Sequence, residues 1–156
     1  MHKRMALHAA VLLVASFTGV GAQGAQSKKP AAQAAPAITV NLTPTCGCCG
    51  KWVEHLKAAG FKVTTNVTAQ LEAVPDRQRV PSQLRTCHTA VVGQYLVEGH
   101  VPVDVIQKML KEKPKIAGIA VPGMPIGSPG MEGPNPRPYS VVAFTADGAT
   151  SEYARR

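Results

Sequence analysis

The sequence predicts one α/β domain, with a mixed central sheet flanked by helices, behind an export segment. Three observations support this prediction. The chain has 156 residues, which is enough for one domain of ordinary size and too few for two large ones. Stretches with the period-two alternation of strands take turns with stretches of helical periodicity. The 14 glycines and 13 prolines indicate long irregular stretches between these elements.

The N-terminus has the composition of a secretory signal peptide. A cationic start at residues 2–4 precedes an uncharged apolar stretch over 5–20, and small residues follow it. We expect a signal peptide over residues 1–22, with cleavage after Ala22 or Ala25, and hence a periplasmic protein. The apolar stretch is short for a membrane span, so an uncleaved anchor is the alternative and no stable membrane insertion is expected after cleavage.

The next segment is predicted to be a flexible linker over residues 23–37. It contains two prolines and no large apolar side chain, so it cannot contribute to a core. The folded domain is therefore expected over residues 38–156. The chain has a formal net charge of +8, but its basic residues are scattered and do not alternate with aromatic side chains. With the export signal, this pattern predicts no nucleic-acid partner.

The first half of the domain alternates between strand and helix patterns. Residues 38–42 are β-branched and alternating, which predicts a strand. A helix is expected over 48–59, with Gly60 as its stop. Residues 61–67 predict a second strand, and 69–80 a weak helix interrupted by a proline.

The second half adds a hairpin and another helix. Two apolar runs within 89–101 flank Gly93-Gln94, which suits a two-residue hairpin turn. Pro102 is expected in the first turn of a helix whose apolar stripe starts at Val105 and stops before Pro114. The order strand, helix, strand, helix, strand, strand, helix is that of a thioredoxin-like fold, with the first helix as a right-handed crossover.

The C-terminal region is less regular. Residues 122–138 are rich in glycine and proline and predict an ordered or semi-ordered loop. Strand patterns over 139–144 and 150–153 flank Asp147-Gly148, a strong hairpin signal. We expect this β-hairpin to add an edge to the sheet or to cover it.

Three of the four cysteines lie within four positions. Cys46 and Cys49 form a CxxC pair, and Cys48 adds a third thiol between them at the junction of the first strand and first helix. A helix N-terminus favours thiolate over thiol. Because Cys49 shares an apolar helical stripe with Trp52, it is expected to point inward and to be the least accessible of the three.

The fourth cysteine, Cys87, precedes His88 just before the predicted third strand. In a thioredoxin-like fold this loop lies against the start of the first helix, where thioredoxins carry a cis-proline. Four sulfurs and one imidazole are thus predicted to converge from distant segments. Thiolates are soft ligands that select Cu(I), and several unbound thiolates in one place would repel one another. The pattern therefore favours a copper site.

Two methionines extend the candidate ligand set. Met124 and Met131 lie in the Gly/Pro-rich loop, and a thioether is a soft Cu(I) ligand that survives an oxidising compartment. The alternative is that both side chains simply fill gaps beneath the loop. The candidate metal ligands are Cys46, Cys48, Cys49, Cys87, His88, Met124 and Met131.

Other interpretations of the cysteines remain open at this point. Cys46 and Cys49 suit a thiol–disulfide oxidoreductase, with Cys46 as nucleophile and Cys49 as resolving thiol, or an inert structural disulfide. Four thiolates can also hold structural zinc, although the usual two-plus-two spacing is missing, or an iron–sulfur cluster. His88 can be an ordinary core or surface imidazole, and His55 and His100 are expected to be structural or solvated.

Several motifs occur together in a fixed order. They are PTCGCCGKW over 44–52, CHTA over 87–90, EGHVP over 98–102, VPGMP over 121–125 and GSPGME over 127–132. Through them, residues 38–153 resemble the CopG-like periplasmic copper-resistance proteins. The resemblance implies a thioredoxin-like fold, copper held by the four clustered cysteines, and a redox role in copper detoxification.

The function expected from the sequence is therefore that of a periplasmic copper-binding protein. Its cysteine thiolates would bind Cu(I), as one ion or a multinuclear cluster, in copper resistance or copper redox handling. The expected partners are copper ions and other periplasmic copper-handling proteins.

Overall fold

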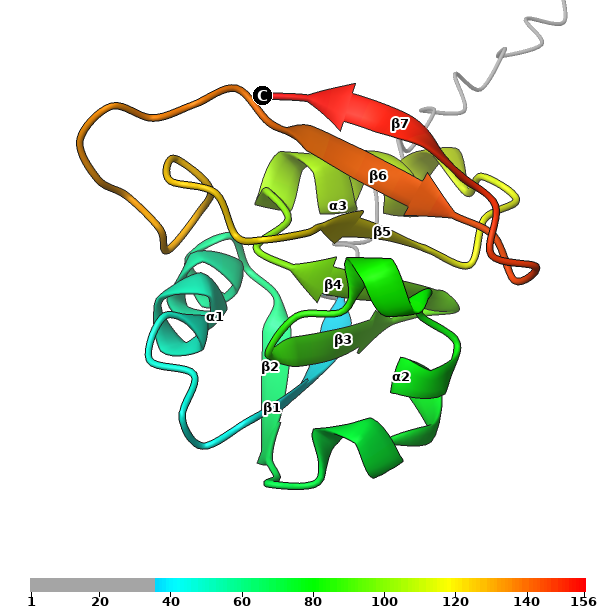
Figure 1. Cartoon of the computed structure of the whole chain (residues 1–156), viewed down its shortest axis with the longest axis horizontal. Coiled ribbons are helices and arrows are strands. Elements are labelled where there is room, and N and C mark those ends of the chain that lie inside the picture. The colour runs from blue at the N-terminus through cyan, green and yellow to red at the C-terminus, as the bar shows by residue number, and fades with distance from the viewer. Residues whose placement is uncertain (1–35) are drawn as a thin grey trace, which may run out of the picture. The chain divides into compact units, whose positions relative to one another are not determined.

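A computed structural model of the chain describes residues 36–156 (Figure 1). Seven strands form one mixed sheet in the order β2-β1-β3-β4-β5-β6-β7. The predicted mixed sheet flanked by a few helices is thereby confirmed. The predicted signal peptide over 1–22 and most of the predicted linker over 23–37 lie outside the described residues. Within the described part, no helix is both long and apolar enough to cross a membrane.

The first three elements form a parallel unit. Strand β1 (Ala37–Leu42) leads through helix α1 (Cys49–Ala58) to β2 (Lys62–Val67), which pairs with β1 in parallel. Parallel neighbours need a crossover connection, and α1 supplies it. Gly60, at φ +88°, follows the helix as predicted and allows the chain to reverse toward β2.

The weak helix predicted over 69–80 is wrong in its extent. The structure has 3₁₀ turns η1 (Leu71–Ala73) and η2 (Ser82–Leu84), and a single turn of α-helix, α2 (Pro75–Gln78), between them. Pro75 cannot continue a preceding helix, because it lacks an N–H group and holds Val74 in an extended conformation, at ψ 120°.

The next strands run antiparallel and lead to the second long helix. Strand β3 (His88–Val92) pairs with β1 and with β4 (Tyr95–Gly99), and helix α3 (Val103–Glu112) follows. The predicted turn contains Gly93 at φ +59°. Pro102 was predicted inside the first turn of α3 but is the residue just before it, with an extended ψ of 140°. Its ring still presets the chain direction at the helix start.

The sequence analysis missed one strand. Strand β5 (Gly118–Val121) pairs in parallel with β4 and antiparallel with β6, so it lies inside the sheet. All four of its residues are buried. A strand covered on both faces shows no period-two alternation, so the pattern that identified the other strands was absent here.

The chain ends in a hairpin at the edge of the sheet. Strand β6 (Ser140–Phe144) joins β5, and β7 (Thr150–Arg155) forms the last strand, with both antiparallel to their neighbours. The hairpin therefore extends the sheet. The long loop between β5 and β6 runs past α1 in Figure 1. At Gly130, φ +82°, a Cβ would lie 2.9 Å from the backbone nitrogen of Trp52, so the loop passes very close to the backbone of this helix.

Two apolar clusters occupy the two faces of the sheet. Alternate residues of the strands follow this division, as Val97 belongs to one cluster and its neighbour Leu96 to the other. The larger cluster packs against α1 and α3 through side chains such as Trp52 and Ile106. The smaller one packs against the segment between β2 and β3, through Leu84. Helix α1 and the segment between β2 and β3, which flank the site described next, are thereby both anchored to the core.

Candidate metal centre

The site forms where β1 ends beside the start of β3. Leu42 is the register partner of His88, and the N–H of Thr43 donates to the carbonyl of Cys87 at 3.1 Å. The chain leaving β1 and the chain entering β3 therefore pass side by side. This pairing brings Cys87 against the loop that carries Cys46, although the two lie 41 positions apart.

The four cysteine sulfurs converge. Cys46 Sγ lies at bonding distance from the sulfurs of both Cys49 and Cys87, with Cα–Cα distances of 5.5 and 6.1 Å that suit a disulfide in either case. Cys49 Sγ and Cys87 Sγ are 3.3 Å apart, and Cys48 Sγ lies 3.8 Å from Cys46 Sγ. Because a sulfur forms only one disulfide at a time, this is a cluster of thiols with alternative partners.

The beginning of α1 supplies the field around these thiols. Cys49 is its first residue and Cys48 caps it, with no side-chain hydrogen bond to the exposed N–H groups and no acidic residue in the first turn. The positive end of the helix dipole therefore faces the sulfurs and favours thiolate. Cys49 is fully buried, whereas Cys46, Cys48 and Cys87 are partly exposed, which agrees with the inward orientation predicted for Cys49.

The structure brings one of the two candidate methionines to the cysteines. Met124 Sδ lies 3.7 Å from Cys87 Sγ and 4.0 Å from Cys48 Sγ. Gly123 and Met124 both have positive φ, 74° and 46°, and turn the chain sharply after β5. No hydrogen bond of the described residues joins the Met131 thioether to a cysteine. Met131 instead closes a turn of the loop through its backbone, with its N–H 2.8 Å from the Ser128 carbonyl.

His88 presents a lone pair to the sulfurs. Its Nε2 lies 3.1 Å from the carbonyl oxygen of Gly99, which can only accept, so Nε2 carries the proton. Its Nδ1, 3.4 Å from Cys49 Sγ, is then the free acceptor. Burial lowers the pKa of His88 to about 3, so the ring is neutral at ordinary pH. A neutral imidazole oriented by a carbonyl is the usual form of a histidine metal ligand.

His100 is a site residue that the sequence analysis missed. It is fully buried, and neither ring nitrogen has a hydrogen-bond partner among residues 36–156. One nitrogen lies within 4.8 Å of the sulfurs of Cys48 and Cys49. Burial lowers its pKa; the Pro129 carbonyl opposes this without reaching hydrogen-bond geometry. An unpaired buried polar group costs free energy, and a bound ion would remove that cost.

A signal for His100 existed in the sequence. A two-residue turn at Gly93-Gln94 pairs Thr89 with Glu98, and the structure has this pairing. Residue 100 thus follows the end of β4 that lies beside the start of β3, at His88. The two rings lie 5.3 Å apart. By contrast, His55 is exposed, as expected, and pairs with Glu132 at 2.8 Å.

Trp52 fixes the imidazoles in place. Its ring lies 4.6 Å from that of His88 and is stacked on that of His100 at 6.2 Å, measured between centroids. Its indole N–H donates to the carbonyl of Val101 at 2.9 Å, so the buried ring has its polar group satisfied. Trp52 therefore belongs to the core and also supports the site.

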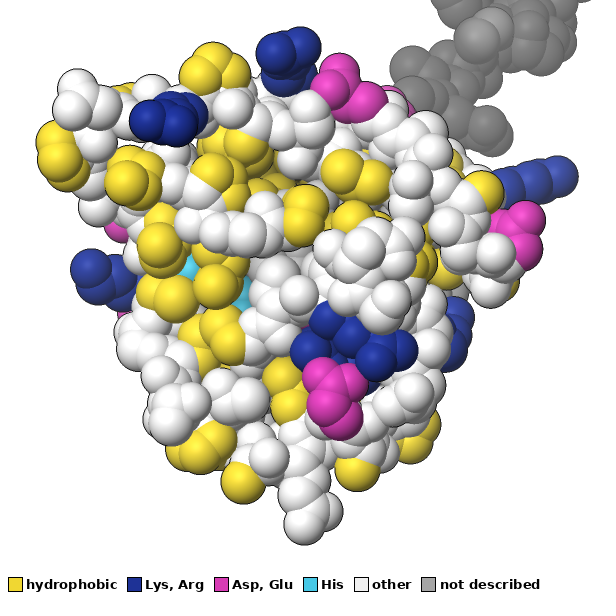
Figure 2. Space-filling model, in the orientation of Figure 1, with side chains coloured by type: hydrophobic (Ala, Val, Ile, Leu, Met, Phe, Trp, Pro, Cys, Tyr) yellow, Lys and Arg dark blue, Asp and Glu magenta, His cyan; other side chains and the backbone are white. Residues whose placement is uncertain are grey.

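The donor atoms form two overlapping groups that share Cys49. Cys46, Cys49, Cys87 and His88 offer one ligand atom each within 4.8 Å of one another, and so do Cys48, Cys49 and His100. Neither group contains a carboxylate. Figure 2 shows only small areas of histidine on this face, surrounded by hydrophobic side chains, a class that here includes cysteine and methionine. This donor set is soft and its surroundings are apolar, which suits a thiophilic metal ion.

The chain is similar to two solved structures. One, described as "Copper resistance protein copG- Form 2", is 46% identical, with a TM-score of 0.72, and the match covers 78% of this chain and 98% of that one. The other, "Copper resistance protein copG- Form 1", is 47% identical, with a TM-score of 0.71, covering 77% and 96%.

A family model gives a partial match. The model described as "Protein of unknown function, DUF411" matches residues 84–131, the stretch that holds Cys87, both buried histidines and Met124. A search of the curated proteins found no match. The resemblance inferred from the sequence motifs is confirmed by the two solved structures, and the chain belongs to the CopG-like family of copper resistance proteins.

Proposed function

We propose that this protein binds Cu(I) through its clustered cysteine thiolates and acts in copper resistance in the periplasm. The observation that supports this most strongly is the convergence of four sulfurs with a buried imidazole that has no hydrogen-bond partner in the described part of the chain. His100 makes this more than a group of neighbouring cysteines. An unpaired buried imidazole costs free energy, and a bound ion would remove that cost.

The donor chemistry favours Cu(I) over other ions. Thiolates and thioethers are soft ligands, and Met124 contacts two of the cysteines. Zinc accepts thiolate and imidazole but prefers four ligands in a closed tetrahedron, whereas this site offers more donors in two groups that share Cys49. A cluster with sulfurs bridging more than one Cu(I) would use such an arrangement. His88 and His100, both neutral, would serve as further ligands.

The fold around the site supports a thioredoxin-like domain. Its first four strands have the order β2-β1-β3-β4, with β1 and β2 parallel and β3 and β4 antiparallel. We assign this unit, with β5, the Gly/Pro-rich loop and the hairpin β6-β7 as its extension, to the domain predicted over 38–156. The signal peptide predicted from residues 1–22 is the basis for the periplasmic location.

A redox role for the site is the second candidate. Cys46 lies beside two alternative disulfide partners, Cys49 and Cys87, and thiol–disulfide exchange proceeds through such a change of partner. The protein would then act as a periplasmic oxidoreductase through Cys46 and Cys49, or change the oxidation state of the copper that it holds.

The substitution Cys87→Ser separates the two functions. It keeps the size of the side chain but replaces a soft sulfur by a hard, largely protonated oxygen. We expect the Cu(I) affinity to fall about tenfold or more, in line with the cost of disturbing a metal site. Reduction of insulin through Cys46 and Cys49 should persist. Competition with a chromogenic Cu(I) chelator measures the first quantity and an insulin turbidity assay the second.

Cys87→Ala serves as a second variant, since it cannot ligate at all. If both variants keep the wild-type Cu(I) affinity, Cys87 and the CxCC loop do not form one metal site. If both variants also keep insulin reduction, the oxidoreductase becomes the better description of the protein.

A further inference from the structure

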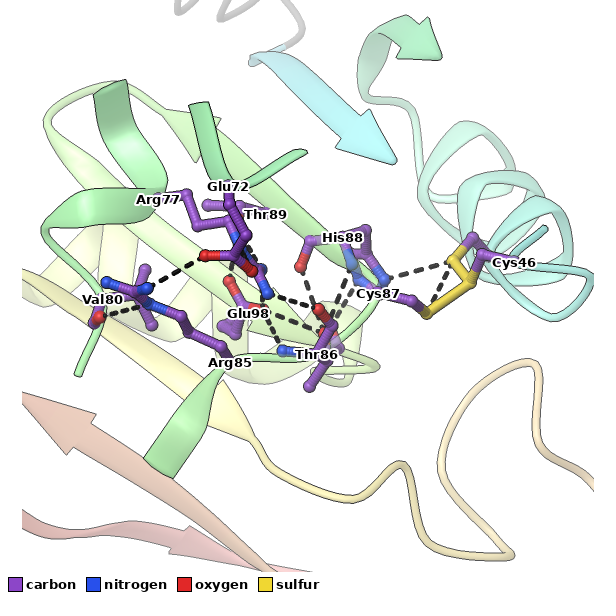
Figure 3. A network of polar contacts seen from close by, with 12 residues as sticks. Cys46, Glu72, Arg77, Val80, Arg85, Thr86, Cys87, His88, Thr89 and Glu98 are labelled. Carbon is purple, nitrogen blue, oxygen red and sulfur yellow. Dashed lines mark hydrogen bonds and ion pairs between the residues drawn. A yellow bond between two sulfur atoms is a disulfide. The ribbon is translucent and has the colours of Figure 1, made fainter. Parts of the chain in front are cut away.

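We propose that the buried ion pair Arg77–Glu98 is a positioning device that holds Cys87 at the metal centre. The inference builds on the proposed function, since it gives this ion pair a purpose at the copper site. Figure 3 shows the network on one side of the segment 85–88 and the sulfurs on the other. Neither Arg77 nor Glu98 was a candidate in the sequence analysis.

Cys87 lies in a segment without regular structure. Residues 85–87 connect η2 to β3 and take part in no helix or strand. Such connections are usually the more mobile parts of a protein. A metal ligand must be held close to its productive position, and the bond from the Thr43 N–H holds only the carbonyl side of Cys87. The backbone on the other side of Cys87 needs a further support.

The ion pair bonds both backbone groups of the preceding residue. The N–H of Thr86 donates to Glu98 Oε1 at 2.5 Å, and Arg77 Nη2 donates to the carbonyl of Thr86 at 2.9 Å. The Thr86 hydroxyl has two acceptors within reach, Glu98 Oε1 at 3.0 Å and the His88 carbonyl at 3.1 Å. The carbonyl of Thr86 belongs to the peptide unit that joins Thr86 to Cys87, so its orientation helps to set the position of the Cys87 Cα, from which the side chain starts.

The pair itself is fixed on all sides. Arg77 Nη1 lies 3.1 Å from Glu98 Oε1, and Arg77 Nε lies 2.6 Å from Glu72 Oε1. The Thr89 hydroxyl donates to Glu98 Oε2 at 2.6 Å. The Glu98 side chain is fully buried and that of Arg77 is 6% exposed. Two ions so enclosed and so well bonded can hold a neighbouring backbone rigidly.

Stability alone gives a weak reason for such a pair. Burying two charges costs so much solvation that apolar side chains of similar size often serve as well or better. Here the ions also bond Thr86, which apolar residues cannot do. Glu98 in addition begins a run of three residues that all serve the site. The Gly99 carbonyl accepts a hydrogen bond from the His88 Nε2–H, and His100 contributes the imidazole that has no partner among the described residues.

The test is the double variant Arg77→Met with Glu98→Leu. It removes both charges together, so no ion is left unpaired and the fold should persist, with a melting temperature near that of the wild type. The backbone of Thr86 loses its partners. In the metal-free protein oxidised mildly with diamide, peptide mapping measures how Cys46 divides between Cys87 and Cys49. We expect the Cys46–Cys87 fraction to fall and alkylation of reduced Cys87 to speed up relative to Cys48.

The copper readout comes second. We expect the double variant to bind Cu(I) about tenfold more weakly, the size of effect seen when the groups that orient a metal ligand are removed. The matched control is Arg85→Met. Arg85 bonds Glu72 and the carbonyl of Val80 in the same network, but its side chain does not bond residues 86–88. It should leave both the disulfide division and the affinity unchanged.

A second variant covers the case in which the double variant does not fold. Thr86→Val keeps the ion pair and removes only the hydroxyl, so it should shift the disulfide division in the same direction by a smaller amount. A folded double variant with wild-type disulfide division and Cys87 reactivity would overturn the proposal, as would an unchanged division in Thr86→Val. These readouts need no copper, so they stay valid if the wild type binds none, a result that would contradict the proposed function instead.

Discussion

The two sides of Cys87 are opposite in chemistry. On one side lie soft sulfurs and neutral imidazoles, and His100 has no hydrogen-bond partner within the described residues. On the other lie hard ions, in which Arg77 bonds Glu72, Glu98, Thr86 and Thr89 at once. On the ionic side, the buried polar groups find their hydrogen-bond partners among the described residues, whereas on the sulfur side the ring nitrogens of His100 do not. A group left unsatisfied in an otherwise well-satisfied interior marks the place where a ligand from outside is expected.

Electrostatics reinforces this contrast. Burial raises the pKa of Glu98, while hydrogen bonds from Thr89 and Thr86 and the charge of Arg77 act against that rise. On the sulfur side, burial lowers the pKa of both histidines. The Gly99 carbonyl opposes this at His88, and the Pro129 carbonyl and the charge of Glu132 oppose it at His100, but burial has the larger effect in both cases. On the ionic side, the hydrogen bonds and Arg77 therefore stabilise the buried charge of Glu98. On the sulfur side, the two imidazoles are neutral, and charge arises only when a thiol ionises or a cation binds.

The largest expected effect comes from breaking the ionic side. Arg77→Met alone leaves Glu98 buried and uncompensated, so the free energy of unfolding should fall by about 3–5 kcal/mol. Arg85→Met, with its arginine 22% exposed, should cost about 1 kcal/mol or less. Urea denaturation of the two variants at pH 7 measures the difference. Equal losses would mean that the buried pair has no special place in the fold.

The second effect concerns the neutral side and acts through pH. Because the pKa of His88 falls to about 3 on folding, from an ordinary value near 6.5, the unfolded chain binds more protons between those values. Above pH 6.5, protonation of this residue costs the folded state nothing. As the pH falls from 6.5 toward 3, the unfolded chain takes up the proton first, so the free energy of unfolding decreases. For the reduced, metal-free protein we expect a loss of about 2 kcal/mol between pH 7 and 5. His100 acts in the same direction.

Urea denaturation at several pH values checks this slope. His88→Gln keeps a donor for the Gly99 carbonyl but does not titrate, so it should flatten part of the dependence. A metal-free wild type with the same stability at pH 7 and pH 5 would show that the imidazoles are not buried in neutral form.

The third effect sharpens the sulfur side by comparing its two methionines. Met124→Leu removes a thioether that contacts Cys48 and Cys87, while Met131→Leu removes one for which no such contact is found. We expect about tenfold weaker Cu(I) binding for the first change, or about 1.4 kcal/mol, and no change for the second. Competition with a chromogenic Cu(I) chelator compares them. Equal affinities in both variants would place Met124 outside the metal's surroundings.

Local patterns predicted most elements of this fold. The alternation in 38–42 and the helical stripe through Trp52 matched the structure because each element buries one face. The buried strand β5 escaped because it is covered on both sides. The weak helix over 69–80 was overestimated because Pro75 and Pro81 divide the segment into single turns.

The site was predictable where residues are close in sequence or where topology is simple. The CxCC loop and Cys87 followed from the order of strands and helices. To predict that His100 lies at the site, one needs the residue pairing of the β3-β4 hairpin. The two-residue turn at Gly93-Gln94 fixes that pairing, so this part of the site was predictable from the sequence. Arg77 and Glu98 could not be paired from the sequence, because the irregular segment between β2 and β3 determines where Arg77 lies. The choice between Met124 and Met131 depended on the path of a Gly/Pro-rich loop, which has no periodicity.

The most direct test of the central claim is a competition between metals at the sulfur side. The reduced wild-type protein is dialysed anaerobically to equilibrium against equimolar Cu(I) and Zn²⁺, each buffered by a chelator of known affinity, and the bound metals are counted. The account predicts that at least one Cu(I) is retained per chain in preference to zinc, because the donors are soft thiolates and a thioether. Retention of zinc with copper excluded would contradict it.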